Sequence, residues 1–156
     1  MQLRVAAVGQ RMPGWVNEAW TEYTRRMPPS LSLSLREITL AKRSKNADIK
    51  RLTASESKAL YEAMPARGRV IALDIGGQAW STGKLADRLE QWMGEGRDVG
   101  FMIGGPDGID SRVMQKADER WSLGPLTLPH PLVRVVLAEQ LYRAWTITQN
   151  HPYHRA

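Results

Sequence analysis

The side chains best suited to chemistry are concentrated at the C-terminal end of the chain. All three histidines follow residue 129, and the chain ends with His151, Pro152, Tyr153, His154, Arg155 and Ala156. Imidazole and phenol groups can transfer protons, and a guanidinium can hold phosphate or stabilise an anion. Pro152 stops the preceding helix, so we expect residues 151–155 to leave it as an extended arm. Such an arm suits an unstacked RNA base beside its phosphate, and the alternative is a frayed polar end.

A second candidate is the glycine turn at residues 104–108, Gly-Gly-Pro-Asp-Gly, which follows an apolar run at residues 99–103. Glycines let a backbone approach a ligand closely, and in open α/β sheets ligands lie at the carboxyl ends of the strands. The turn is neither a dinucleotide-binding fingerprint nor a P-loop. The pattern therefore leaves a ligand loop and an ordinary structural turn both open.

Charge and composition favour an acidic partner and no metal. Lysine and arginine number 22 against 16 acidic residues, and the net charge of +6 favours nucleic acid bound through its phosphates. The densest basic cluster contains Lys42, Arg43 and Lys45, and it predicts either phosphate contacts or a solvated helix entrance. The chain has no cysteine, and no acidic residue accompanies the histidines of the tail. We therefore expect no metal site and no disulfide.

Apolar patterns predict the strands and helices that must position these groups. Strands are expected at residues 3–8, 31–35, 70–75 and 99–103, with a short extended piece at 121–123. Helices are expected to begin near Pro13, Asn46, Thr82, Asp110 and Pro131, and Gly76-Gly77 is expected to turn the chain after the third strand.

Strands that alternate with helices favour an α/β fold with a mostly parallel sheet, and 156 residues fit one domain, residues 1–156. No apolar stretch is long enough to cross a bilayer, and the N-terminus lacks the regions of a signal peptide. We therefore expect a soluble, cytoplasmic protein without membrane contact.

Several motifs together resemble one family. They are the glycine turn, the run Leu-Thr-Leu-Pro-His-Pro-Leu-Val-Arg-Val at residues 126–135, Glu-Gln-Leu-Tyr-Arg-Ala-Trp at 139–145, and the tail at 151–155. Near the N-terminus, Val8-Gly9, Pro-Gly-Trp-Val at residues 13–16 and Lys-Asn-Ala-Asp-Ile-Lys-Arg at 45–51 fit the same pattern. The sequence thus resembles, over essentially its whole length, the RlmH family of ribosomal large-subunit pseudouridine N3-methyltransferases in the SPOUT superfamily.

The resemblance implies a SPOUT-type α/β knot, with a mostly parallel sheet flanked by helices and a C-terminal trefoil knot. It implies a homodimer that uses S-adenosylmethionine, with no metal, to methylate N3 of a pseudouridine in the helix 69 loop of 23S rRNA. That base is position 1915 in the standard rRNA numbering, and the substrate is the assembled ribosome. Two alternatives stay open: a knotted methyltransferase that acts on tRNA, and a noncatalytic RNA-binding or ribosome-assembly module.

The resemblance also implies roles for individual residues. The cofactor is expected at Leu73, Gly104, Leu123, Gly124, Pro125, Leu126, Thr127 and Leu128. The acceptor N3 carries an imide proton, so a general base or a stabilising cation would assist transfer. His154 and Tyr153 are candidates for these roles, with Arg134 as a third catalytic candidate. RNA contacts are expected from Lys42, Arg43, Lys45, His130, Arg143, His151 and Arg155.

Overall fold

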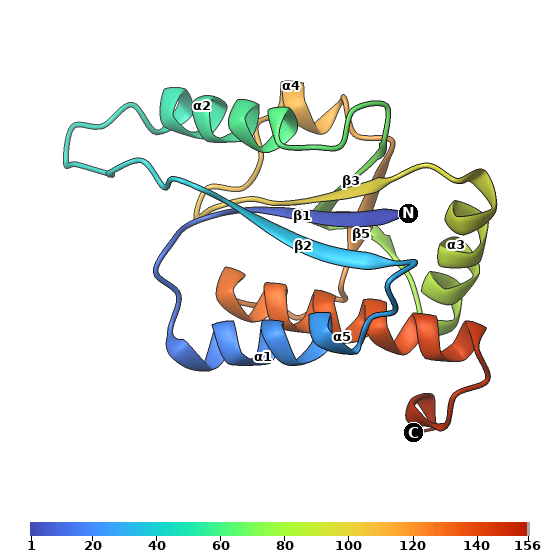
Figure 1. Cartoon of the computed structure of the whole chain (residues 1–156). Helices are drawn as coiled ribbons and strands as arrows, with labels where there is room; N and C mark the ends of the chain where they lie inside the picture. Colours follow the sequence, from blue (N-terminus) through green and yellow to red (C-terminus); the bar gives the residue numbers. More distant parts are fainter. Residues whose placement is uncertain (156) are drawn as a thin grey trace.

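Five parallel strands form the centre of this computed structural model, which describes residues 1–155 (Figure 1). The elements run β1 (Gln2–Val8), α1 (Gly14–Arg26), β2 (Ser32–Ile38), α2 (Ile49–Glu62), β3 (Arg69–Ala79), α3 (Thr82–Glu95), β4 (Val99–Ile103), α4 (Ser111–Met114), β5 (Glu119–Ser122), α5 (His130–Thr148) and the 3₁₀ turn η1 (Pro152–His154). The strand order is β2-β1-β4-β3-β5, and every pairing is parallel. The predicted α/β fold with a parallel sheet is confirmed, and the trefoil knot stays a prediction.

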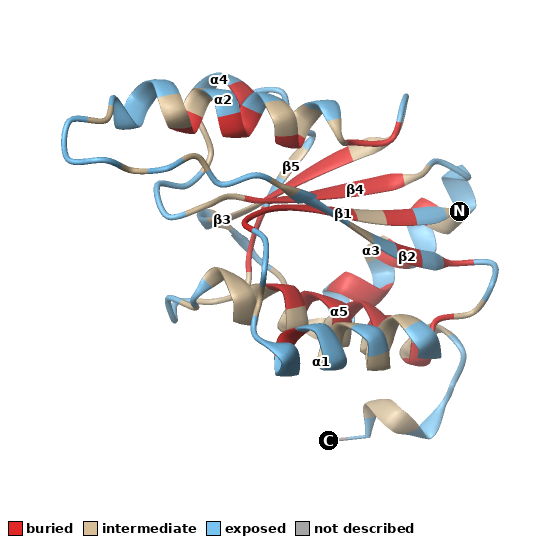
Figure 2. Cartoon of the chain, turned by 60° about the vertical axis from the view of Figure 1, so that its left-hand side comes forward, coloured by how far each residue is buried: buried red, intermediate tan, exposed pale blue. Residues whose placement is uncertain are grey.

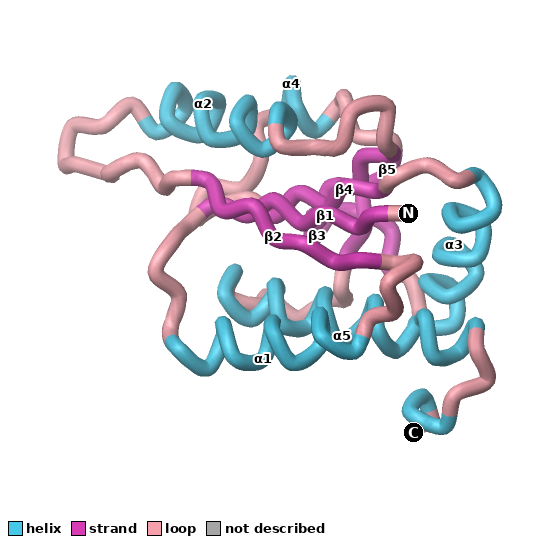
Figure 3. The backbone as a smooth tube through the Cα atoms, in the orientation of Figure 1, coloured by secondary structure: helices cyan, strands magenta, loops and turns pink. Residues whose placement is uncertain are grey.

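Helices cover both faces of the sheet, which explains the continuous apolar runs in the sequence. Side chains alternate across β1: Leu3, Val5 and Ala7 face a core shared with α1, α3 and α5, whereas Ala6 and Val8 face α2 and α4. Figure 1 shows these two layers on opposite sides of the strands, and Figure 3 shows the strands as the middle layer. The buried residues follow the strands and the inner faces of the helices (Figure 2).

The third strand is longer than predicted. β3 continues to Ala79, and its pairing with β5 shifts register between Leu73 and Gln78. The expected turn at Gly76-Gly77 is therefore wrong, because the glycines lie within an irregular stretch of the strand. A Cβ on Gly77 would stand 2.6 Å from the carbonyl carbon of Arg120, so only glycine allows this close approach to β5.

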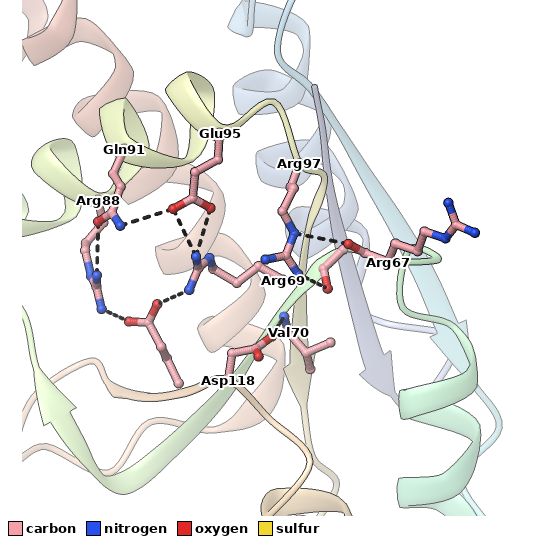
Figure 4. Close-up of polar contacts among 10 residues, drawn as sticks. Arg67, Arg69, Val70, Arg88, Gln91, Glu95, Arg97 and Asp118 are labelled. Atoms are coloured by element: carbon pink, nitrogen blue, oxygen red, sulfur yellow. Dashed lines mark hydrogen bonds and ion pairs between the residues drawn. The ribbon is translucent and has the colours of Figure 1, made fainter.

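Charged residues close the amino ends of β3 and β5 (Figure 4). Arg69 at the start of β3 donates to Glu95 of α3 at 2.8 Å and to Glu119 of β5 at 3.3 Å. Arg88 of α3 also bonds Glu119, whose side chain is only 12% exposed. This network fastens α3 to the two strands at the end of the sheet where they begin.

The last helix spans the molecule. Pro131 lies in the first turn of α5, as the sequence predicts, and Leu137, Leu141 and Ala144 are fully buried in the core. At 1.5 Å per residue, the 19 residues of α5 extend over about 28 Å. In Figure 1 the helix begins on the left, where the strands end, and the tail lies on the right.

Candidate active site

A cavity of about 410 Å³ lies at the carboxyl ends of β3, β4 and β5, where ligands bind in open α/β folds. Its volume is in the usual range for small-molecule sites. Three chain segments and two side chains from nearby elements line it: Leu73, Asp74, Ile75; Ile103, Gly104, Gly105, Pro106, Gly108, Ile109; Leu123, Gly124, Leu126, Thr127, Leu128, Pro129, His130, Val133; and Met114 and Trp121.

The structure brings together the segments that the sequence predicts for a cofactor. Seven of the eight expected residues line the cavity, and the eighth, Pro125, does not. Ile75, which the sequence reading missed, lines the cavity and is 77% exposed, and Leu126 is 76% exposed. The available signal for Ile75 was an apolar residue directly after the buried part of a strand.

The glycine turn (residues 104–108) forms one wall of the cavity. Gly105 and Gly108 form a bridge, and Gly108 has a φ of +75°. A Cβ on Gly104 would stand 2.7 Å from the carbonyl carbon of Gly108 and 2.8 Å from its oxygen. Glycine at 104 is therefore required by the fold of the turn, and a side chain there would disturb the cavity wall through the backbone.

The loop after β5 forms the opposite wall. The Ser122 hydroxyl donates to the carbonyl oxygen of Gly124 at 3.1 Å and accepts from its N–H at 3.2 Å. Gly124 has a φ of +130°, a conformation that other residues rarely adopt. These contacts fix the loop where it leaves the sheet, and Gly124 and residues 126–128 lie beside the cavity.

His130 and Arg134 lie at the start of α5. His130 lines the cavity, and burial, assisted by the charge of Arg134, lowers its pKa, so the imidazole is neutral at pH 7. Arg134 is 1% exposed and donates to the Gly9 carbonyl at 2.8 Å and to Glu37 at 2.7 Å. Through these contacts the buried guanidinium fixes the loop after β1 beside His130. The expected catalytic or phosphate-binding role of Arg134 stays a prediction.

The basic cluster between β2 and α2 divides into exposed and bonded residues. Lys42 and Lys45 are exposed, as a phosphate contact requires. Arg43 is not available, because its guanidinium bonds Glu56 of α2 and Asp107 of the glycine turn. The sequence shows the charge of Arg43 but not these partners, which lie 13 and 64 residues away.

The tail does not form the expected extended arm. Residues 152–154 form η1, whose first turn is capped by the His151 imidazole, and Tyr153 packs back onto α5. The Tyr153 hydroxyl donates to Glu139 at 3.1 Å, and its ring meets Tyr142 at 4.7 Å between centroids. Burial, with further effects from Tyr23 and Glu139, raises the pKa of Tyr153, so the phenol stays protonated.

These contacts involve two of the predicted residues. The Tyr153 phenol is protonated and bonds Glu139 of its own subunit, so it anchors the tail, and its catalytic role stays a prediction. Arg143 pairs through Nε with Glu139 at 2.8 Å and lies 5.0 Å from the centre of the Tyr153 ring, and its contact with RNA stays a prediction. Arg155 is exposed, and His154 has a buried Nδ1 with no hydrogen-bond partner among residues 1–155.

The tail leaves the C-terminal end of α5 and folds back to Glu139, which lies about 14 Å along the helix from His130, and none of residues 151–155 lines the cavity. Within one subunit, His154 and Arg155 therefore do not approach the cavity. Among residues 1–155 the structure has no group of three or more side chains suited to bind a metal ion, and no helix long and apolar enough to span a membrane.

Comparison with known proteins gives a consistent result. Residues 1–154 match a family model described as "Predicted SPOUT methyltransferase". Proteins named "Ribosomal RNA large subunit methyltransferase H" are similar over 99% of this chain and 100% of their own length. Those from Methylococcus capsulatus and Azotobacter vinelandii are 52% identical, and that from a Marinomonas species is 50% identical.

A solved structure shares the fold. A probable methylase family protein from Haemophilus influenzae aligns with a TM-score of 0.54, covering 95% of this chain and 66% of that one. The identity is 10%, so this likeness concerns the fold alone.

Proposed function

The chain belongs to the SPOUT methyltransferases and, among them, to the RlmH family, and we propose from this that it methylates ribosomal RNA of the large subunit. We propose further that the methyl group comes from S-adenosylmethionine and that the acceptor is N3 of the pseudouridine in the helix 69 loop of 23S rRNA. The observation that carries the proposal is the identity of 50–52% over the whole length of relatives named as large-subunit rRNA methyltransferases.

The cavity fits this cofactor chemically. Apolar side chains such as Leu73 and Leu128 suit the adenine ring and the methionine stem, and the loop backbone at residues 124–128 can bond the adenine edge. Gly104 packs so closely against the Gly108 backbone that a side chain at this position would shift the turn and the cavity wall that it forms. The bound cofactor supplies a methyl group that is already activated, so the task of the protein is mainly to align donor and acceptor.

The cavity holds two candidate bases, the Asp74 carboxylate and the His130 imidazole, but neither lysine nor arginine is among its lining residues. Removal of the imide proton from N3 is assisted by a base or by a nearby cation. His130 is neutral and faces the cavity, whereas His154 and Arg155 lie at the far end of α5. We therefore assign His154 and Arg155 to the cavity of a second subunit, in a homodimer.

The exposed surface of α5 supports this assembly. Leu132, Val136 and Trp145 stay partly exposed after the helix has packed against α1 and α3. A second copy that covered these side chains would remove apolar surface from water, as homodimer interfaces do. Lys42, Lys45, His151 and Arg155 remain candidates for RNA contact, because each of them is exposed.

Two measurements test the proposed function. Calorimetric titration of the protein with S-adenosylmethionine should show saturable binding, and unmodified ribosomes should accept a labelled methyl group while bulk tRNA should not. Transfer to tRNA but not to ribosomes would support the tRNA methyltransferase instead. Absence of cofactor binding by the folded protein would favour a noncatalytic RNA-binding module and overturn the proposal.

A further inference from the structure

Arg43 connects two loops that the proposed function assigns to different ligands. It lies in the basic loop (residues 39–48), which projects beyond the end of the sheet between β2 and α2 (Figure 1). Its Nε and Nη2 atoms donate to Oδ2 of Asp107 in the glycine turn, at 3.3 and 3.2 Å. Lys42 and Lys45 of the same loop are exposed, and four other residues of the turn line the cavity.

Every N–H group of the Arg43 guanidinium has a hydrogen-bond partner. Besides the two bonds to Asp107, Nη2 donates to Glu56 at 2.8 Å, Nη1 bonds the other carboxylate oxygen of Glu56, and Nη1 also donates to the Ala41 carbonyl at 2.9 Å. Five N–H donors thus serve five contacts, and only the planar fork of arginine offers this arrangement. The Arg43 side chain is 19% exposed, so water competes little with these bonds.

Helix α2 contacts both the basic loop and the glycine turn through adjacent residues. Glu56 is 4% exposed and accepts from the Ala41 N–H at 2.9 Å as well as from Arg43. Burial raises the pKa of Glu56, but the bonds from Arg43 and Ala41 outweigh that effect and the pKa lies below its ordinary value. The next residue, Ser57, is fully buried and accepts from the Asp110 N–H at 2.8 Å, just after the glycine turn. Adjacent residues of α2 therefore fix the basic loop and the turn.

We propose that Arg43 is a positioning residue that couples RNA binding at the basic loop to cofactor binding at the glycine turn. Phosphate bound by Lys42 and Lys45 would restrict the motion of the basic loop. Through the Arg43–Asp107 contact, the glycine turn that forms the cavity wall would then be restricted as well. The coupling is reciprocal, so a bound cofactor strengthens RNA binding by the same factor. This inference rests on the proposed function, because it requires that both ligands bind where that function assigns them.

The test is a ratio of affinities. The affinity for unmodified 70S ribosomes is measured with and without saturating S-adenosylhomocysteine, which has lost its methyl group and does not react. The parent protein should bind ribosomes at least about fivefold more tightly with the ligand, the lower end of usual coupling factors. Asp107→Asn keeps the Arg43–Glu56 contact but loses the charged partner in the turn, and its ratio should fall below about twofold.

Two variants serve as controls. Asp107→Glu restores a carboxylate and should recover most of the parent ratio. Glu62→Gln breaks an exposed ion pair with Lys58 at 3.9 Å on the same helix, away from both loops, and should keep the full ratio. A merely structural contact predicts that Asp107→Asn lowers the melting temperature while leaving the ratio unchanged, and that result overturns the inference.

The outcomes also separate this inference from the proposed function. Calorimetry of the parent with S-adenosylhomocysteine alone shows whether the cofactor site exists. If no ligand binds, the proposed function and the coupling both fail. If the parent binds the ligand and methylates ribosomes, but its ratio is one or is unchanged in Asp107→Asn, only the coupling fails.

Discussion

Mixing two defective variants tests whether the tail of one subunit serves the cavity of the other. One variant, Gly104→Ala, has a disturbed cavity wall and an intact tail. The second carries His154→Ala and Arg155→Ala and has an intact cavity. Tyr153 of the tail bonds Glu139, about 14 Å along α5 from His130 at the cavity, whereas reacting groups must come within about 3.5 Å of one another. We therefore expect each site to combine the cavity of one subunit with the tail of the other.

The expected yield follows from counting sites. Equal amounts of the two variants, exchanged at random, give about one half mixed dimers, and each mixed dimer has one intact cavity beside one intact tail. The unfractionated mixture should therefore regain about one quarter of the parent sites, and the isolated mixed dimer about one half. If the tail acted on its own subunit, no site in the mixture would be intact.

The assay is methyl transfer to unmodified ribosomes after co-expression of the two variants with different affinity tags and isolation of the mixed dimer. The cofactor is kept below the parent dissociation constant, so that the defect of Gly104→Ala stays visible. Each variant alone, carried through the same procedure, gives the background. Mixed dimers that are folded but no more active than this background would refute the shared site, and a monomeric parent would remove its premise.

Three further predictions follow from the same contacts. Gly104→Ala should weaken S-adenosylmethionine binding by about tenfold or more, since relief of a backbone overlap costs about 1–3 kcal/mol; calorimetry showing the parent affinity would contradict this. Replacing Lys42 and Lys45 with alanine should reduce the steepness of the plot of log affinity for ribosomes against log salt concentration by about 2, and cofactor binding should stay intact. An unchanged slope would place the RNA-binding surface elsewhere. The folded-state pKa of Glu56 lies below its ordinary value of 4.5, so the ion pair stabilises the fold fully above that pH and is lost as the pH falls through the folded-state pKa. Glu56→Gln should therefore be less stable at pH 7 and show a flatter loss of stability below pH 4.5 in denaturant titrations, and a parent-like acid dependence would refute the assignment.

Much of the fold and of the cavity could be predicted because it depends on local patterns. The apolar runs at residues 70–75 and 99–103 can be satisfied only by strands buried on both faces, and such strands require helices on both sides. The glycine turn directly after one of these runs fixes its place at the carboxyl edge of the sheet. The buried strands and the position of the glycine turn can therefore both be predicted from the residues of a short segment alone.

The roles of the arginines could not be predicted in this way. Arg134 bonds Gly9 and Glu37, which are 125 and 97 residues away, and the tertiary fold alone brings these groups together. From the sequence alone, an arginine can be predicted equally well to bind phosphate or to form an ion pair inside the protein. Only the burial of the side chain in the folded structure distinguishes the two roles. The tail misled for a related reason. Pro152 does end α5, but no local pattern indicates that Tyr153 packs against Tyr142 and bonds Glu139 of the same helix.

The two outer strands of the sheet limit how copies of this chain can associate. An edge strand exposes unpaired backbone groups to which another chain can add. Here β5 has only four residues, and β2 exposes Ser32, Ser34 and Arg36 along its length. Short edge strands and charged edge side chains are the usual devices against such additions. Two copies therefore do not readily join their sheets edge to edge. Association through a layer of helices remains available to them.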